Sequence, residues 1–179
     1  MTKVTFVRHG QTNQNIKELN GTANGEEDDA LNETGINQVK ETAEALKNET
    51  FDIIISSPYQ RATQTAAIIN KYHNVQIRVE EDFRERDGGG VDAKIWHDSF
   101  DFDTQTSHTF DGEPLTDFFE RVYTTLDKIK ENHKENAHIL IVAHGGVYHA
   151  LRAYFKKLPW KGNLRVDLVH NGGTRKYEF

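Results

Sequence analysis

The sequence contains no cysteine, and only three of its 179 residues are proline. Without cysteine the protein can form no disulfide, no thiolate metal site and no cysteine nucleophile. Long apolar runs are also missing, since none approaches the roughly 20 residues that span a bilayer. The first residues lack the basic and apolar layout of a signal peptide. We therefore expect a cytoplasmic protein that does not associate with membranes.

The sequence also has fewer basic than acidic residues, 22 against 28, so its formal net charge at pH 7 is −6. An acidic balance argues against a nucleic-acid partner. It does not exclude an anionic small molecule, which responds to the local field of a pocket. A mean hydropathy of −0.74 is typical of a globular protein with a polar surface. The length predicts one domain over residues 1–179, and nothing in the sequence specifies an oligomeric state.

Short apolar runs alternate along the chain with segments whose apolar residues recur at helical spacing. Strands are predicted at residues 4–7, 51–55, 75–79, 138–143, 164–169 and 174–179. Helices are predicted at residues 35–46, 62–72, 115–129 and 147–154. This alternation predicts an α/β fold, a three-layer helix–sheet–helix sandwich whose mixed central sheet is mostly parallel.

Two segments fall outside the alternation. Residues 11–34 are polar and are predicted to be irregular. Residues 98–113 contain five acidic residues and no lysine or arginine, which predicts a solvated loop or lid excursion. A plain surface loop and a substrate-facing role fit that composition equally well.

Polar residues follow three of the predicted strands, where open α/β sheets present their chemistry. The first strand ends in Arg8-His9-Gly10. The second leads through Ser56-Ser57-Pro58-Tyr59-Gln60 to Arg61, in the first turn of a helix. The strand at 138–143 leads to His144-Gly145-Gly146, where a glycine pair opens a helix and offers its backbone N–H groups and positive dipole end.

Each of these residues taken singly has an ordinary interpretation. Arg61 is compatible with a salt bridge on a helix surface, and His144 with a structural histidine at a strand end. Three strand ends with the same kind of charge favour a common role instead. Two arginines, two histidines and a helix N-terminus make an anion trap suited to a phosphoryl group. The remaining histidines are scattered and show no metal-binding motif, so we expect neither a metal nor another cofactor.

At these positions the chain resembles the histidine phosphatase superfamily, also called phosphoglycerate-mutase-like. The motifs that carry the resemblance are Arg8-His9-Gly10-Gln11-Thr12 with Asn15, the segment Ser56–Thr65, and Val142-Ala143-His144-Gly145-Gly146. Weaker matches are Leu31-Asn32-Glu33-Thr34-Gly35 through Gln38, and Phe83-Arg84-Glu85. The resemblance implies a mixed sheet between helices and a mechanism through phosphohistidine.

The resemblance also implies a role for each matching residue. His9 would be the nucleophile and Glu85 the proton donor, with Arg8, Arg61 and His144 completing the catalytic set. The phosphate-binding set implied in the same way consists of Arg8, Thr12, Asn15, Arg61, His144 and Gly145.

The chain departs from the family after Glu85. Arg86-Asp87-Gly88-Gly89-Gly90 follows where the family usually has aromatic residues, which puts the substrate preference in doubt more than the chemistry. Glu80, Glu81 and Asp82 lie near enough in the sequence to compete with Glu85 for the acid role.

The sequence therefore predicts a metal-independent phosphatase that hydrolyses a small phosphomonoester through a phosphohistidine on His9. One alternative is a mutase, which returns the phosphoryl group to a second hydroxyl instead of to water. Another is a non-catalytic module that binds a phosphorylated ligand. The acidic segments at 26–29 and 98–113 suggest the further hypothesis that highly charged polyphosphates are poor substrates.

Overall fold

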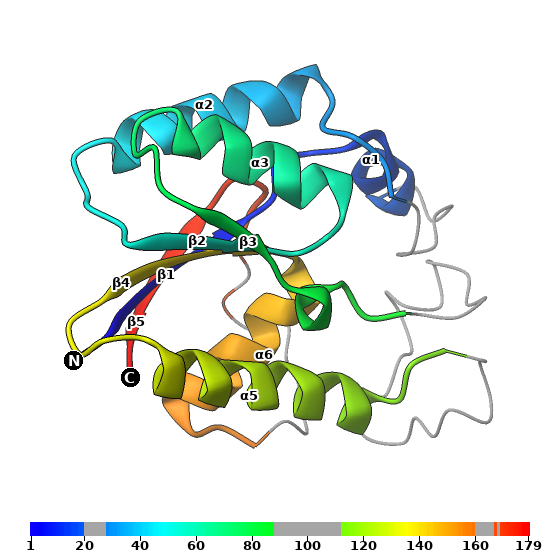
Figure 1. The fold of residues 1–179 in the computed structure, drawn as a ribbon. Coiled ribbons are helices and arrows are strands. Elements are labelled where there is room, and N and C mark those ends of the chain that lie inside the picture. Colours follow the sequence, from blue (N-terminus) through cyan, green and yellow to red (C-terminus); the bar gives the residue numbers. More distant parts are fainter. Residues whose placement is uncertain (20–27, 88–111, 160–166, 168) are drawn as a thin grey trace.

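The computed structural model describes residues 1–19, 28–87, 112–159, 167 and 169–179 (Figure 1). The elements in chain order are β1 (Lys3–Arg8), α1 (Asn13–Leu19), α2 (Glu33–Leu46), β2 (Ile53–Ser56), α3 (Gln60–Asn70), β3 (Ile77–Val79), the 3₁₀ turn η1 (Glu81–Phe83), α5 (Leu115–Asn132), β4 (His138–Ala143), α6 (Gly145–Lys156) and β5 (Thr174–Glu178). The strands form one sheet in the order β3-β2-β4-β1-β5.

The sheet is parallel except at β5, which pairs antiparallel with β1. β4 lies at its centre, and its apolar residues alternate between the two faces. Ile139 and Ile141 belong to one core cluster, whereas Leu140 and Val142 belong to the other. A strand covered on both sides reads as a continuous apolar run, which is why its bounds could be predicted from the sequence.

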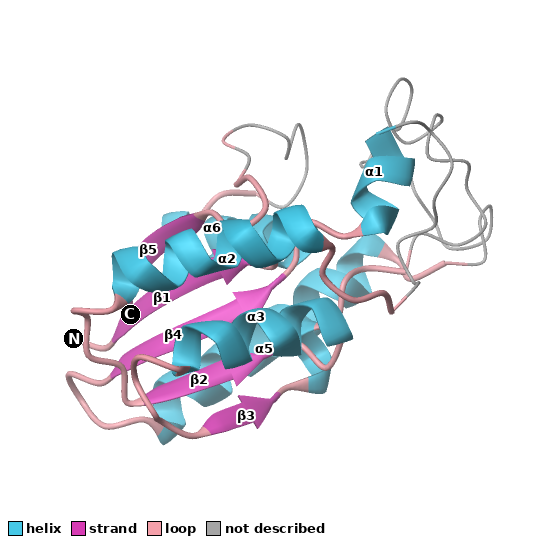
Figure 2. Cartoon of the chain, turned by 90° about the horizontal axis from the view of Figure 1, so that it is seen from above, coloured by secondary structure: helices cyan, strands magenta, loops and turns pink. Residues whose placement is uncertain are grey.

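Helices cover both faces of the sheet, as Figures 1 and 2 show. α2 and α3 pack on one face through residues such as Val39 and Ile69. α5 and α6 pack on the other through residues such as Phe118 and Leu151. The predicted α/β sandwich with a mixed, mostly parallel sheet is therefore confirmed. None of the helices in the described part of the chain is long and apolar enough to cross a bilayer.

The expectation that residues 11–34 are irregular was wrong over α1. This helix is too short to show an apolar period, and it begins with reciprocal capping instead. The backbone N–H of Asn15 donates to Thr12 Oγ1 at 3.2 Å, and the backbone N–H of Thr12 donates to Asn15 Oδ1 at 3.1 Å. α2 begins at Glu33, before the predicted start, because Asn32 Oδ1 accepts from the Gly35 N–H at 2.8 Å.

Two further predictions concern segments that are mostly not described. The loop or lid at 98–113 lies outside the described residues except for Gly112 and Glu113. The strand predicted at 164–169 also lies outside them except for Asp167 and Val169, and neither of these is in a strand. The strand predicted at 174–179 is confirmed as β5, and the turn before it is formed by residues 171–173.

Gly10 packs the end of β1 directly against the start of α2. A Cβ at this position would lie 2.5 Å from the Gly35 carbonyl oxygen and 2.7 Å from a methyl group of Val39. We expect Gly10→Ala to lower the free energy of unfolding by about 1–3 kcal/mol, the usual cost of overpacking. Urea denaturation measures this difference.

Gly145→Ala is the matched control, because a Cβ there would come no nearer than 3.6 Å to the Arg8 side chain. Its stability should stay within about 0.5 kcal/mol of the parent protein. Equal stability of the two variants would contradict the close approach at Gly10.

Candidate active site

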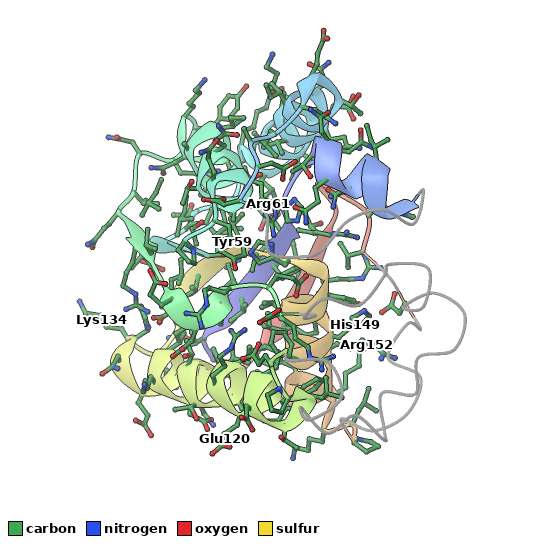
Figure 3. All side chains as sticks on the ribbon, turned by 90° about the vertical axis from the view of Figure 1, so that its right-hand side faces the viewer. Tyr59, Arg61, Glu120, Lys134, His149 and Arg152 are labelled. Carbon is green, nitrogen blue, oxygen red and sulfur yellow. The ribbon has the colours of Figure 1, made fainter. Side chains whose placement is uncertain are left out.

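The carboxyl ends of β1, β2 and β4 are neighbours in the sheet, so the polar residues that follow them meet at one edge. Arg8 is paired in register with Ala143, the residue before His144. The rings of His9 and His144 lie with their centroids 5.1 Å apart. Arg61 lies at the start of α3, at the sheet edge that faces the viewer in Figure 3. The structure therefore brings the predicted histidines and arginines together.

His9 is 3% exposed, and its ring has a defined orientation. Nδ1 lies 2.8 Å from the carbonyl oxygen of Gly10. Because a carbonyl only accepts hydrogen bonds, Nδ1 carries the proton and Nε2 keeps its lone pair. Burial, reinforced by the charges of Arg61 and Arg8, holds the pKa of His9 well below its usual value of 6.5. His9 is therefore a neutral imidazole, the form that can act as a nucleophile.

His144 is fully buried and occupies the residue just before α6. Its Nε2 lies 2.6 Å from Ser57 Oγ, while its buried Nδ1 has no hydrogen-bond partner among the residues that the structure describes. Burial, proximity to His9 and the charges of Arg61, Arg8 and Arg121 lower the pKa of His144 as well. A bound anion would act in the opposite direction, because negative charge favours the protonated form of an imidazole.

The two arginines approach the site from different sides. Arg8 Nη1 donates to the Val169 carbonyl oxygen at 2.9 Å, and its guanidinium lies beside Gly145. Arg61 is only 3% exposed, so the alternative of a salt bridge on a helix surface is wrong. Its guanidinium carbon lies 4.7 Å from the centre of the Tyr59 ring. Both cations are thus held close to the two imidazoles.

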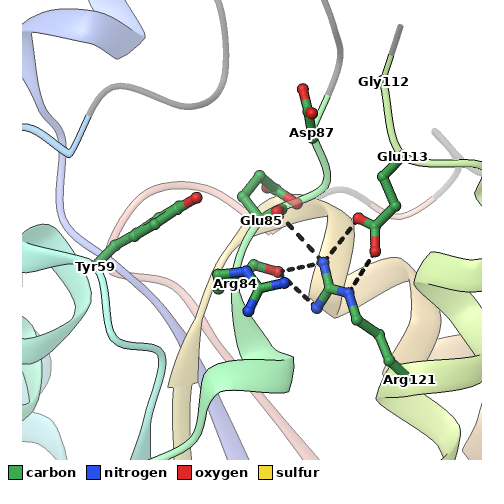
Figure 4. A pocket seen from close by; sticks show the side chains of 7 residues that line it. All are labelled: Tyr59, Arg84, Glu85, Asp87, Gly112, Glu113 and Arg121. Atoms are coloured by element: carbon green, nitrogen blue, oxygen red, sulfur yellow. Dashed lines mark hydrogen bonds and ion pairs between the residues drawn. The ribbon is translucent and has the colours of Figure 1, made fainter.

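Glu85 reaches the same region from the segment that follows η1. Its Oε2 accepts a hydrogen bond from the backbone N–H of Gly146 at 3.0 Å, in the first turn of α6. With Tyr59 it lines a cavity of about 360 Å³, shown in Figure 4. The carboxylate therefore lies between the helix N-terminus that follows His144 and an open space large enough for part of a substrate.

The acidic residues that compete with Glu85 have other contacts. Glu80 and Glu81 form ion pairs with arginines at 3.8 and 3.7 Å. Asp82 Oδ2 accepts a hydrogen bond from Thr125 at 3.2 Å. Unlike Glu85, none of the three lines the cavity beside Tyr59. The geometry favours Glu85 as the acid.

Within the described ranges, no group of three or more histidine, aspartate or glutamate side chains could hold a metal ion.

Thr12 and Asn15 lie at the start of α1, where they cap one another. Asn15 Oδ1 also accepts from Asn171 Nδ2 at 3.1 Å. Thr12 is fully buried. These bonds account for how the two side chains are held, and a contact of either with phosphate stays a prediction.

A turn near the C-terminus, which sequence reasoning did not connect with the site, holds the backbone of Arg8 and His9. Asn171 Nδ2 donates to the His9 carbonyl oxygen at 3.1 Å. The Gly172 N–H lies within 3.1 Å of the carbonyl oxygens of Arg8 and His9, and the Arg8 N–H donates to the carbonyl oxygen of Gly173. Asn-Gly-Gly signals a turn in the sequence, but no local pattern shows that the turn contacts residues so distant along the chain.

The lowered pKa values of His9 and His144 predict that stability depends on pH. Just below pH 6.5 the folded protein still keeps both rings neutral, whereas the same histidines in the unfolded chain bind protons there. The free energy of unfolding should therefore fall as the pH drops below about 6.5, by at most about 1.4 kcal/mol per pH unit for each histidine. Urea denaturation between pH 7.5 and 5 measures this slope.

The less buried His73 and His138 also have lowered pKa values and contribute to the slope. The informative control is therefore a variant with alanine at positions 9 and 144, which should show a shallower slope. An unchanged slope in that variant would contradict the assignment of neutral imidazoles to the site.

The fold and the site thus define an α/β protein whose three-layer sandwich carries imidazole and guanidinium side chains at the carboxyl edge of its sheet. Comparison with known sequences gives the family. Residues 4–179 match the sequence profile of the histidine phosphatase superfamily (branch 1), and the chain belongs to this superfamily.

Its relatives include phosphatases. The chain is 36% identical over 156 residues to an uncharacterized phosphatase, PhoE, of Bacillus subtilis, covering 84% of this chain and 76% of the relative. It is 27% identical over 186 residues to a metal-independent phosphoserine phosphatase of Arabidopsis thaliana, covering 95% and 76%.

Similar solved structures include a mycobacterial glucosyl-3-phosphoglycerate phosphatase in complex with VO3, with a TM-score of 0.81, 25% identity and coverage of 97% of this chain and 90% of the other. YhfR of Bacillus stearothermophilus has a TM-score of 0.82 and 26% identity, with coverage of 99% and 91%.

Proposed function

We propose that this protein is a metal-independent phosphatase that hydrolyses small phosphomonoesters through a phosphohistidine on His9. The observation that carries the proposal is the state of His9: it is neutral, and the Gly10 carbonyl holds its Nδ1 proton so that Nε2 keeps its lone pair. The charges of Arg61 and Arg8 act on that ring and lower its pKa. A neutral nucleophile among fixed cations suits attack on an anionic phosphoryl group.

In the first step, the lone pair of His9 Nε2 forms a bond to phosphorus while the bond from phosphorus to the ester oxygen breaks. The leaving oxygen takes a proton from the carboxyl group of Glu85 and departs as an alcohol. Arg8, Arg61 and His144 stabilise the charge that spreads over the three equatorial oxygens. Ser57 can donate to Nε2 of His144, which then offers its Nδ1 proton to the phosphoryl group.

In the second step, water attacks the phosphorus of the phosphohistidine. The carboxylate of Glu85 takes a proton from that water, and the bond from phosphorus to Nε2 breaks. Inorganic phosphate leaves, and both His9 and Glu85 return to their starting protonation states. Side chains of the protein supply every charge that these two reaction steps need.

Two of the relatives support hydrolysis as the outcome, although a 2,3-bisphosphoglycerate-dependent phosphoglycerate mutase of Cytophaga hutchinsonii is also 29% identical to this chain. A metal-independent phosphoserine phosphatase and a glucosyl-3-phosphoglycerate phosphatase are both similar to this chain over more than nine tenths of its length. We propose a small-molecule phosphomonoester as the substrate on the same basis.

Product analysis tests the proposal against a mutase. The protein is incubated with a panel of phosphomonoesters that includes 3-phosphoglycerate, with the His9→Ala variant as the blank. We expect inorganic phosphate and the free alcohol in equal amounts. Accumulation of 2-phosphoglycerate in place of phosphate would instead identify a mutase. Tight binding of a panel member with no turnover of any would identify a binding module.

A further inference from the structure

Arg121, on α5, lies beside the segment that carries Glu85 and lines the same cavity, and all three of its guanidinium nitrogens are engaged (Figure 4). Nε and Nη2 contact the two carboxylate oxygens of Glu113 at 2.6 and 2.9 Å. Nη1 donates to the carbonyl oxygen of Asp82, and both Nη atoms lie 3.2 Å from that of Arg84. Nη2 also reaches the carbonyl oxygen of Glu85 at 3.4 Å. One side chain therefore holds three backbone carbonyls of a single short segment.

Residues 84–87 of this segment form no helix or strand, and few other hydrogen bonds fix their backbone. The Arg84 N–H donates to the carbonyl oxygen of Glu81 at 3.1 Å, and the Arg86 N–H donates to Glu85 Oε1 at 3.0 Å. Glu113 adds further contacts. The Glu113 N–H donates to the carbonyl oxygen of Asp87 at 3.0 Å, and Arg86 Nε donates to the carbonyl oxygen of Glu113 at 2.9 Å. The pair formed by Arg121 and Glu113 is mostly buried, with 13% and 18% of the side chains exposed. A buried, bidentate pair of this kind has a fixed geometry.

The position of the Glu85 carboxylate depends on the backbone of this segment, because the carboxylate lies close against Gly146. Its Oε2 lies 3.0 Å from the Gly146 N–H, and a side chain at Gly146 would overlap the carboxylate. A small shift of the backbone at 84–85 would therefore move the carboxylate off the helix N-terminus and away from the site. Displacements of about 1 Å are enough to cost large factors in rate.

We propose that Arg121, held by Glu113, is a positioning residue for the proton donor: it fixes the backbone that presents Glu85 to the leaving oxygen. This inference rests on the proposed role of Glu85. It makes a specific kinetic claim, because a proton donor matters only when the leaving oxygen is strongly basic. Damage to Arg121 must therefore slow substrates with poor leaving groups and spare those with good ones.

The experiment compares kcat/KM for p-nitrophenyl, phenyl and benzyl phosphate, which have similar shapes but leaving oxygens of increasing basicity. For Arg121→Met we expect a loss of about 10²-fold with benzyl phosphate, the lower range for general acid catalysis. With p-nitrophenyl phosphate the loss should stay below about threefold, because that leaving group needs little protonation. kcat/KM is the right constant because it reports the steps up to phosphoryl transfer even where hydrolysis of the intermediate limits kcat.

Three further variants complete the design. Glu85→Gln should show the same dependence on the leaving group, and combining it with Arg121→Met should add little, because both act through one carboxyl group. Glu113→Gln keeps the shape of its side chain while removing its charge, and it should give a smaller loss with the same dependence. Arg78→Met removes an arginine that pairs with Glu80 and should leave all three substrates unchanged.

The outcomes separate this inference from the proposed function. A leaving-group dependence in Glu85→Gln together with uniform losses in Arg121→Met and Glu113→Gln would overturn the positioning role and leave the proposed function intact. Uniform losses in Glu85→Gln would overturn the assignment of the proton donor and the role of Arg121 with it. Losses in kcat/KM that grow with the basicity of the leaving oxygen in Glu85→Gln, Arg121→Met and Glu113→Gln support the inference.

Discussion

Replacing His9 with alanine will abolish turnover, with an expected loss on the order of 10⁵-fold or more in kcat, because the variant has no group that can accept the phosphoryl group. Steady-state assays with p-nitrophenyl phosphate measure the loss. Binding should largely survive, since Arg8 and Arg61 remain. Calorimetric titration with inorganic phosphate should give an affinity within about tenfold of the parent protein, as expected when the charge-assisted bonds stay in place.

His133→Ala is the control for this variant, because His133 follows the C-terminal end of α5 and takes no part in the site. It should keep full activity. A His9→Ala protein that retained even a few per cent of the parent activity would contradict the assignment of the nucleophile.

Replacing Arg61 with methionine has the second largest expected effect, a loss of about 10²–10³-fold in kcat/KM. This is the usual cost of removing one preorganised donor from a charged transition state. Arg61→Lys should recover only part of the rate, because an ammonium group cannot reproduce the two-pronged contact of a guanidinium with phosphate oxygens. Both values come from the same steady-state assay.

The stability of the Arg61→Met protein separates a role in the reaction from a role in folding. Arg61 is buried next to His9 and His144, and its charge lowers the pKa of both histidines. Methionine keeps the apolar stem of the side chain and removes a charge that disfavours protonation of both histidines. We therefore expect a change in the free energy of unfolding of less than about 1 kcal/mol. A large destabilisation that paralleled the loss of activity would assign Arg61 to the core instead.

Much of the fold could be predicted because the strands and helices carry local patterns. The apolar run at 138–143 coincides with β4, and the apolar spacing of 115–129 falls within α5. α1 could not be found in this way, since its seven residues depend on capping by Thr12 and Asn15 rather than on an apolar face. The order of the strands also has no local signal, although it decides which strand ends are neighbours.

The candidate site likewise contains residues that a local sequence pattern reveals and residues that it does not. Arg8 and His9 could be predicted from their place at the end of β1, and the tautomer of His9 follows from the carbonyl of its immediate neighbour, Gly10. The support from Asn171 could not be predicted, because it joins residues 162 positions apart in the chain. The same holds for Arg121, which reads in the sequence as one charged residue on the polar face of an amphipathic helix. Its contacts with residues 82–85 exist only once α5 has packed against η1.

The most direct test of the account is to trap the phosphoenzyme. The protein is mixed with p-nitrophenyl phosphate, quenched during turnover, digested and mapped by mass spectrometry. We expect one phosphoryl group on the peptide that contains His9, stable in alkali, lost in acid and absent from the His9→Ala variant. An acid-stable phosphate on another residue, such as Ser57, or full turnover with no phosphoryl group on the protein, would contradict it.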